Sequence, residues 1–370
     1  MEKSSTEKLA KRITLVVTHQ CNFDCRYCLQ KHEDVSMTKE TAIKSIDAFA
    51  SGIVEGDKAQ ISFYGGEPLL QKELIKELVN YSCEKILSIP DTRLTFEITT
   101  NGLLLDEDFI TFAKRNKILL ALSHDGLAQD EVRTDRGGNK TKDRIDEKLQ
   151  MLLKTFPETI VMMTVHPDYV DRIVDSLKFF RSKGVKSVSM VLAHGERVSW
   201  DDETFEKLTR EMNKVEALYE QWNAGNDVFR FIPFDNKIKN YIRQRDADSV
   251  TCHFGCHKFM VDADGKYYPC SHFIGREGFC IGSLEEGISE EKLKDLESKR
   301  VEPEDCKGCA LRFRCRHTCA CSNHGHTGSM SEVSALQCEY EKLTIQLADR
   351  AAALLLNESN PGVVSRMYPI

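Results

Sequence analysis

The sequence predicts an α/β fold, in which an open, TIM-like partial barrel of six β–α units precedes a cysteine-rich C-terminal region. Between Arg12 and about Leu192, short apolar runs alternate with segments whose apolar residues recur at helical spacing. Repeated β–α units favour a parallel sheet with right-handed crossovers, and six units are too few for a closed eight-stranded barrel. The six predicted strands are Ile13–Val17, Ile61–Tyr64, Leu94–Thr99, Ile118–Ser123, Ile160–Val165 and Val185–Leu192.

Amphipathic patterns predict the helices. Between the first two strands, apolar residues from Ala42 to Ile53 share one helical face, and another such pattern follows the second strand. A long helix is expected from Asp202 to about Trp222, and a final helix from Val333 to Leu356. We expect an N-terminal extension at 1–11, the barrel at 12–225, the cysteine-rich domain at 226–345, and a helix end with a loosely ordered tail at 346–370.

Composition narrows the class of protein. The 370 residues are 41% hydrophobic and 29% charged, with a formal net charge of −7. A negative charge disfavours nucleic acid as the main partner. The sequence lacks an apolar run of the ~20 residues that a membrane span requires. The first residues also lack the apolar core of a signal peptide. A cytoplasmic protein with no membrane or nucleic-acid partner is therefore expected.

Fourteen cysteines need an explanation in a chain without an export signal. Reducing compartments do not sustain structural disulfides, so metal binding or catalysis is the more natural use. Three cysteines fall between Cys21 and Cys28, and ten fall between Cys252 and Cys338. Cys83 stands alone on a predicted helix, where we expect a core residue. The distribution predicts two separate metal regions.

Four predicted strands end in loops rich in glycine or polar residues. Because functional loops of parallel β/α folds follow the carboxyl ends of strands, these loops are expected on one face, where they predict a ligand site. The loops are Cys21–Cys28, Gly65–Pro68, Thr99–Gly102 and Ser123–Gly126.

The first loop has the spacing C-x3-C-x2-C at Cys21, Cys25 and Cys28. Three thiolates are incomplete for a structural zinc site, which is almost always four-coordinate. A [4Fe–4S] cluster accepts cysteine thiolates, and three ligands would leave one iron open for another molecule. A zinc site completed by a distant residue and incidental buried thiols are the alternatives at this point.

This C-x3-C-x2-C loop, followed by Gly65-Gly66-Glu67-Pro68 after the second strand, resembles the radical S-adenosylmethionine (SAM) superfamily. The resemblance implies that Cys21, Cys25 and Cys28 bind a [4Fe–4S] cluster, whose open iron binds the amine and carboxylate of SAM. It also implies reductive cleavage of SAM to a 5′-deoxyadenosyl radical beside the substrate.

The same resemblance implies a set of SAM-binding residues. The Gly65–Pro68 backbone and the Glu67 carboxylate would hold the methionyl amine. Tyr27 would lie against the adenine, and Arg133 would pair with the SAM carboxylate, although Gln129 replaces the histidine that often begins that segment. Ser123 and Asp125 match ribose-side residues, and Asn101 would contact SAM or substrate. The implied set is Tyr27, Gly65, Gly66, Glu67, Pro68, Asn101, Ser123, Asp125 and Arg133.

The C-terminal cysteines carry a second resemblance. A G-x4-C motif ending at Cys270 is followed by C-x2-C-x5-C-x3-C and a final cysteine, a pattern similar to the SPASM extension of radical SAM enzymes. A zinc ribbon is the alternative, because histidines lie nearby. The resemblance implies two auxiliary [4Fe–4S] clusters, and hence three clusters in total, although the spacing before Cys256 varies in the family. Cys280 and Cys321 are spare thiols that could compete. The implied ligands are Cys252, Cys256, Cys270 and Cys319 for the first cluster, and Cys306, Cys309, Cys315 and Cys338 for the second.

SPASM proteins mostly modify ribosomally made peptides or proteins. The leading interpretation is therefore a maturase that installs a thioether or carbon–carbon crosslink, or a related oxidation, anaerobically and with a flavodoxin- or ferredoxin-type reductant. The runner-up is an anaerobic sulfatase-maturing enzyme, which forms formylglycine from Cys or Ser. In that branch an aspartate after the G-x4-C cysteine acts as base, and here the position is Ser271. Asp262 or Asp264 could replace it, and the catalytic residue stays unknown.

Only about eleven residues precede the first predicted strand, fewer than a leader-recognition domain needs. We therefore expect the precursor peptide to be recognised by the barrel, by the SPASM surface, or through a separate leader-recognition protein. A non-catalytic iron–sulfur electron carrier is the alternative from another class. It accounts for the cysteines but not for Gly65–Pro68 or Arg133.

Overall fold

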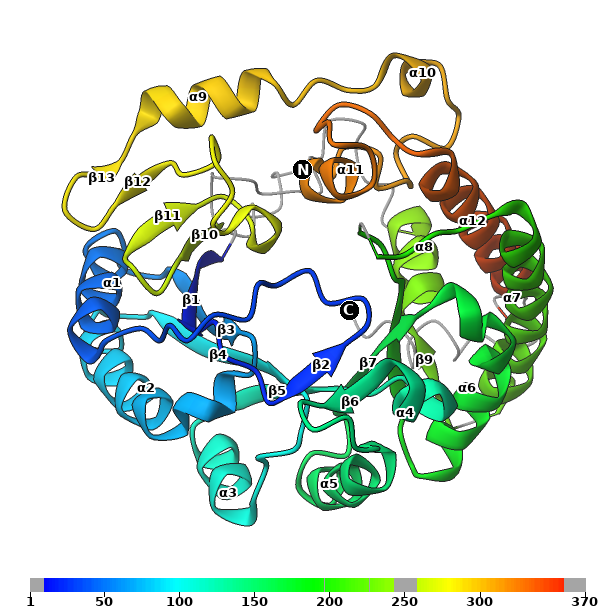
Figure 1. Ribbon diagram of the computed structural model, residues 1–370, viewed down its shortest axis with the longest axis horizontal. Coiled ribbons are helices and arrows are strands. Elements are labelled where there is room, and N and C mark those ends of the chain that lie inside the picture. Colours follow the sequence, from blue (N-terminus) through cyan, green and yellow to red (C-terminus); the bar gives the residue numbers. More distant parts are fainter. Residues whose placement is uncertain (1–9, 196, 226, 243–257, 356–370) are drawn as a thin grey trace, which may run out of the picture.

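The computed structural model describes residues 10–195, 197–225, 227–242 and 258–355, and it confirms the predicted α/β fold. Six parallel strands form the barrel wall in chain order, with helices around the outside (Figure 1). The strands are β1 (Lys11–Thr18), β3 (Lys58–Gly65), β4 (Arg93–Thr100), β5 (Ile118–Ser123), β7 (Ile160–Val165) and β8 (Ser187–Leu192).

The outer helices form where the amphipathic patterns predict them. Ala42 and Ile46 of α1 are fully buried, as the periodicity requires. The long predicted helix is α7, whose first turn is capped by Asp201 and Thr204. The outer helices are α1 (Lys39–Ser51), α2 (Lys72–Ile86), α3 (Glu107–Arg115), α5 (Lys142–Thr155), α6 (Ile173–Ser182) and α7 (Asp202–Asn223).

The core lies between the strands and these helices. Leu15, Ile61 and Val161 are fully buried on the central strands, and Leu177 of α6 is fully buried against them. Each such side chain contributes about 1.5–3 kcal/mol through burial. This rigid wall fixes the carboxyl ends of the strands, from which the candidate site is built.

The C-terminal region attaches to both edges of the open barrel (Figure 1). At one edge, β10 (Lys258–Val261) pairs in parallel with β1 and continues through β11 (Lys266–Tyr268), β12 (Gly282–Ser283) and β13 (Gly287–Ile288). At the other edge, α12 (Ala335–Leu355), the predicted final helix, packs against α7 and α8 (Ile232–Ile242). The remaining C-terminal helices are α9 (Glu290–Ser298), α10 (Glu304–Lys307) and α11 (Ala320–Thr327).

Short elements are the part of the fold that periodicity did not reveal. β2 (Phe23–Cys25) runs through the cysteine loop and pairs antiparallel with β6 (Arg133–Asp135), which follows α4 (Gln129–Val132). β9 (Arg230–Phe231) extends the barrel wall beside β8. In the described part of the chain, every helix is too short or too polar to cross a membrane.

Candidate cluster and cofactor site

The three cysteines of the first loop lie at the carboxyl end of β1. Cys21 and Cys25 are 9% and 8% exposed, and Cys28 is half-buried. The Cys28 N–H donates to the Cys25 carbonyl at 3.1 Å, and the Phe23 N–H donates to Cys21 Sγ at 3.4 Å. The loop therefore turns tightly and encloses its sulfur atoms.

The thiols of this loop favour a bound metal cluster. Burial raises the pKa of Cys21 to about 11 and that of Cys25 to about 12, so both are protonated at neutral pH unless a cation replaces the proton. A structural zinc ion needs four ligands, whereas the three thiolates of this loop match a [4Fe–4S] cluster that keeps one iron open. The residues therefore fit the cluster.

Two glycines allow the loop after β3 to pack against the cysteine loop. The Gly66 N–H donates to the Thr18 carbonyl at 3.0 Å, and the Glu67 N–H donates to the Gln20 carbonyl at 2.9 Å. A Cβ on Gly65, which has φ +147°, would lie 2.0 Å from the Thr18 oxygen, and one on Gly66 would lie 2.3 Å from the Gln20 oxygen. Only glycine fits such an approach. The pair thus fixes the backbone directly before Cys21.

Glu67 joins this loop to the end of β4. Its side chain is buried, and its carboxylate accepts from the Leu69 N–H at 3.0 Å, the Thr100 hydroxyl at 2.7 Å and the Asn101 N–H at 2.7 Å. Burial raises the pKa of Glu67, and these hydrogen bonds oppose that rise. Pro68 is buried and begins the short helical turn that follows. The carboxylate therefore holds two strand-end loops together.

Replacing Glu67 with glutamine is expected to destabilise the fold by about 1–3 kcal/mol, because an amide NH2 would then face one of three donors. Glu73→Gln on the exposed face of α2 is the matched control, and urea unfolding is the measurement. Equal stability of the two variants would contradict the structural role of Glu67.

Asp125 is the centre of a buried network after β5. It accepts hydrogen bonds from the Tyr27 hydroxyl, from Arg133 Nε at 2.7 Å and from the Thr164 N–H at 2.8 Å. The Arg133 guanidinium also lies over the Tyr27 ring, 5.3 Å from its centroid. Burial alone would lower the pKa of Arg133, but Asp125 and Tyr27 raise it overall, so the guanidinium stays charged.

The structure gathers most of the predicted SAM-binding residues around the cysteine loop. Arg133 Nη1 lies 3.9 Å from Cys25 Sγ, and Asn101 Nδ2 donates to Asn22 Oδ1 at 2.7 Å, next to Cys21. Ser123 ends β5 and is half-buried. Their contacts with SAM remain predictions.

The described C-terminal cysteines form two groups. In the first, Cys321 Sγ lies 3.4 Å from Cys319 Sγ and also bonds with Cys270, which lowers the pKa of Cys270 to about 6. The spare thiol thus lies beside two predicted ligands of the first auxiliary cluster. Cys252 and Cys256, the other two predicted ligands, fall outside the described residues.

In the second group, burial and then the neighbouring Cys338 and Cys309 raise the pKa of Cys306, and burial raises the pKa of Cys315 to about 12. Cys280, the other spare thiol, donates to the Gly282 carbonyl at 3.3 Å. Cys83 packs partly against the core, as expected.

Several contacts between the barrel and the C-terminal region were not predicted. His19 Nε2 lies 2.6 Å from Asp262 Oδ1, and this hydrogen bond raises the pKa of His19. Asp264 instead forms an ion pair within the C-terminal region, with Lys266. Tyr64 at the end of β3 bonds with Gln30 near Cys28 and with Ser271 next to Cys270. Sequence offered a signal for three of these residues, because His19 directly follows β1, Asp262 directly follows β10, and Tyr64 lies near the end of β3.

A cluster of four histidines was also not predicted from the sequence. The rings of His194 and His326 stack with centroids 4.7 Å apart, and His272 lies 5.6 Å from His324 in an edge-on contact. Burial lowers the pKa of all four, to about 4 for His272 and His326. Three histidines follow cysteines of the C-terminal region closely, and His194 follows β8.

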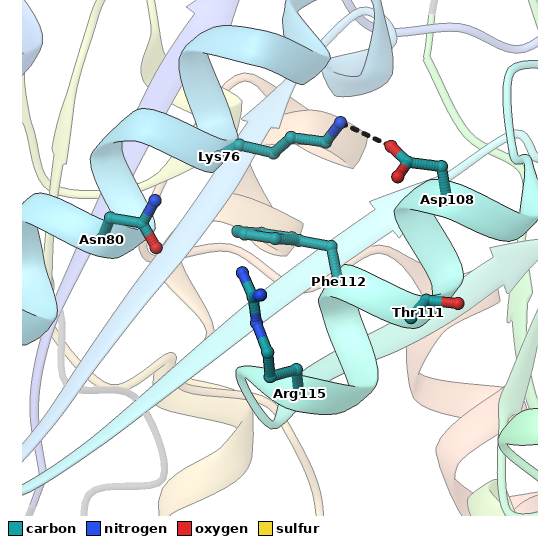
Figure 2. A pocket seen from close by; sticks show the side chains of 6 residues that line it. All are labelled: Lys76, Asn80, Asp108, Thr111, Phe112 and Arg115. Atoms are coloured by element: carbon teal, nitrogen blue, oxygen red, sulfur yellow. Dashed lines mark hydrogen bonds and ion pairs between the residues drawn. The ribbon is translucent and has the colours of Figure 1, made fainter.

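One surface hollow in the described part of the chain lies away from this site. A hollow of about 310 Å³ between the outer helices α2 and α3 is lined by side chains that include Arg115, which lies over Phe112 (Figure 2). Lys76 closes one side through an ion pair with Asp108 at 2.7 Å. Because this hollow lies in the outer helical layer, it is separate from the strand-end site.

Fold and site together define a parallel β/α protein with a cluster-binding cysteine loop at the carboxyl end of β1. Residues 15–180 match the model of the radical SAM superfamily. The relatives include the radical SAM cyclopropyl synthase TigE of Paramaledivibacter caminithermalis, 24% identical, with 94% of this chain and 75% of TigE covered. They also include the cysteine-type anaerobic sulfatase-maturating enzyme of Clostridium novyi, 23% identical, with 81% of this chain and 84% of that enzyme covered.

Residues 15–180 therefore form a radical SAM domain, and the chain is an enzyme that uses the cofactors of that superfamily, a [4Fe–4S] cluster and SAM. Native anSMEcpe with bound AdoMet and Cp18Cys peptide has a similar structure. Its TM-score is 0.77 at 20% identity, with 94% of this chain and 99% of that chain covered. This likeness shows the shared fold, including the cysteine-rich C-terminal part.

Proposed function

We propose that this enzyme is a peptide maturase, in which the SAM-binding cysteine loop and the C-terminal cysteine region serve one substrate. The observation that supports this proposal most strongly is the contact between the two cysteine regions. Tyr64 bonds with Gln30 near Cys28 and with Ser271 beside Cys270. Arg197 Nη2 also donates to the Cys28 carbonyl at 3.1 Å, and the nearby His194 stacks on His326 of α11.

The chain's own residues would organise the cofactors. Bound together, the cluster and SAM supply the hydrogen-atom abstraction. Cys21, Cys25 and Cys28 hold the cluster, and the Gly65-Gly66 backbone carries the contact with the methionyl amine, because the Glu67 carboxylate already accepts three hydrogen bonds. Arg133 stays charged beside Cys25 and suits the SAM carboxylate.

We also propose that residues 226–345 form a SPASM domain that binds two auxiliary clusters. The grouping of Cys270 with Cys319, and of Cys306 with Cys338, supports this division. Cys321 competes for the first of these clusters, because it lies beside both Cys270 and Cys319.

The substrate class follows from the relatives and from Ser271. TigE is a cyclopropyl synthase, and the Clostridium novyi relative is a sulfatase-maturating enzyme. Because Ser271 stands where the sulfatase branch has its base, we favour crosslinking or a related oxidation of a ribosomally made peptide over formylglycine formation. A flavodoxin- or ferredoxin-type reductant in the cytoplasm, and a separate leader-recognition protein, complete the proposal.

A base is required whichever product forms. Crosslinking and formylglycine formation each remove two electrons and two protons from the peptide: one hydrogen atom, one electron and one proton. An auxiliary iron–sulfur cluster held by the C-terminal cysteines would supply the electron acceptor, and we assign the proton to the stacked imidazoles of His194 and His326. Both rings are neutral at pH 7, because burial lowers the pKa of each, so their lone pairs are free to accept.

The double variant His194→Gln/His326→Gln is therefore expected to cleave SAM but to form at least about tenfold less peptide product per 5′-deoxyadenosine. Phe279→Leu is the packing control, since Phe279 contacts His324 without offering a base. Chromatography and mass spectrometry measure both products. An unchanged ratio of peptide product to 5′-deoxyadenosine in the double variant would show that these histidines do not accept the proton.

The peptide itself distinguishes the two maturase functions. Reconstituted enzyme, SAM and dithionite are incubated with a synthetic Cys-type sulfatase peptide and, separately, with short precursors encoded beside the gene. A crosslinked or otherwise oxidised precursor supports the proposal, whereas formylglycine in the sulfatase peptide alone establishes the runner-up. Iron-loaded protein that never cleaves SAM would instead be an electron carrier.

A further inference from the structure

A buried ion pair lies beside one of the cysteines of the second auxiliary group. Lys237 of α8 pairs with Glu341 of α12, and their side chains are only 6% and 10% exposed. Burying two charges carries a desolvation cost that apolar residues of similar size would avoid. Such a pair therefore calls for a role other than general stability.

The pair holds the backbone on both sides of Cys315. Lys237 Nζ donates to the Arg314 carbonyl at 2.8 Å, and the Arg316 N–H donates to Glu341 Oε2 at 3.1 Å. Cys315 lies between these two anchored residues, and Glu341 also bonds with its thiol. The direction of the Cys315 side chain thus depends on one ion pair from two helices.

Neighbouring contacts make the arrangement rigid. Arg314 donates to both carboxylate oxygens of Asp349, at 2.7 and 2.6 Å, and to the Lys237 carbonyl at 3.3 Å. Cys338 precedes Glu341 by three residues on α12, so the predicted ligand and the ion pair share one helix face. α12 therefore carries one ligand of the group and positions another.

The charges of Lys237 and Glu341 would also affect the electrostatic potential at a cluster bound by Cys315. Thiolates bound to iron carry negative charge, which the Glu341 carboxylate would repel if it stood alone. Lys237 compensates that carboxylate and places a positive charge close to Cys315. Removing either partner would leave the opposite charge unbalanced beside the sulfur.

We propose that Lys237 and Glu341 are positioning residues for the auxiliary cluster of Cys306, Cys309, Cys315 and Cys338, and that their charges set its reduction potential. This inference rests on the proposed function, because it requires that cluster to form.

The test compares Lys237→Met and Glu341→Gln with the parent chain after anaerobic reconstitution. All three carry Cys25→Ala, so that the auxiliary clusters dominate, and the intact enzyme is measured alongside. Iron per chain and the midpoint potential, followed by electron paramagnetic resonance, are the readouts. K237M is expected to lower the potential of this cluster and E341Q to raise it, each with a loss of less than the four irons of one cluster, so that the cluster that remains reports the potential.

The matched control is Arg350→Met. Arg350 also lies on α12 and pairs with a glutamate, Glu216 of α7, but it contacts no described cysteine. Its iron content and potential are expected to equal those of the parent. If Lys237→Met fails to fold by circular dichroism, the double variant Lys237→Met/Glu341→Leu replaces both charges with apolar groups and is expected to shift the potential less than E341Q.

Iron content and potential together distinguish the absence of the auxiliary clusters from an ion pair that does not affect them. A parent that binds no iron in its C-terminal region contradicts the auxiliary clusters themselves. A parent with those clusters, together with variants whose potentials stay unchanged or move in the same direction, contradicts the role of the ion pair alone.

Discussion

Replacing Cys25 with alanine is expected to abolish SAM cleavage and to remove about four irons per chain. Cys25 is buried within β2, and its backbone pairs with Arg133 of β6, whose guanidinium approaches its sulfur. Neither Cys21 nor Cys28 can replace it, because each would already bind a different iron of the cluster. Iron analysis and 5′-deoxyadenosine formation are the measurements.

Cys83→Ala is the matched control for this variant. Cys83 lies on the outer helix α2 and packs partly against the core. It is expected to keep full iron content and SAM cleavage, at a small cost in stability. Retention of SAM cleavage by the Cys25 variant would show that the cluster is bound by other residues.

Replacing Gly66 with alanine is expected to destabilise the fold by roughly 2–4 kcal/mol and to weaken cluster binding in the same variant. The added Cβ would lie 2.3 Å from the Gln20 oxygen and 2.9 Å from the His19 oxygen, and both are backbone atoms that no rotamer change can move. The segment that must yield leads directly into Cys21. Urea unfolding and iron per chain measure the two effects.

Gly225→Ala controls for the loss of glycine itself, because a Cβ there meets nothing within 4 Å. It is expected to leave both stability and iron content nearly unchanged. A Gly66 variant with normal stability and iron content would contradict the role assigned to the glycine pair.

The barrel could be predicted because its strands are continuous apolar runs and its helices have one apolar face. Both patterns follow from burial against neighbouring elements, and the six predicted strands match β1, β3, β4, β5, β7 and β8. The β2–β6 pair could not be predicted in the same way. It has three residues on each side, too few for any periodicity, and its register depends on the cysteine loop.

The site could be predicted in its residue types but not in its internal contacts. The position of Glu67 after a strand indicates a polar role without showing that its carboxylate faces the β4 loop. Cys321 could be named as a competitor, but its place beside both Cys270 and Cys319 depends on how α11 packs.

Contacts between distant segments gave the least sequence signal. Lys237 and Glu341 are 104 residues apart and lie on two helices whose patterns are otherwise ordinary. His194 and His326 come from a barrel loop and from α11, and neither belongs to a recognised motif. Both pairs form because the C-terminal region packs against the barrel, through β10 beside β1 and through α12 against α7 and α8. No local sequence pattern encodes this packing.

Anaerobic reconstitution followed by addition of SAM and dithionite tests the central claim most directly. The proposed enzyme is expected to bind about twelve irons per chain with negligible zinc, and to release 5′-deoxyadenosine. Protein that contains only zinc, or that binds iron but leaves SAM intact, would contradict the account of the site built on Cys21, Cys25 and Cys28.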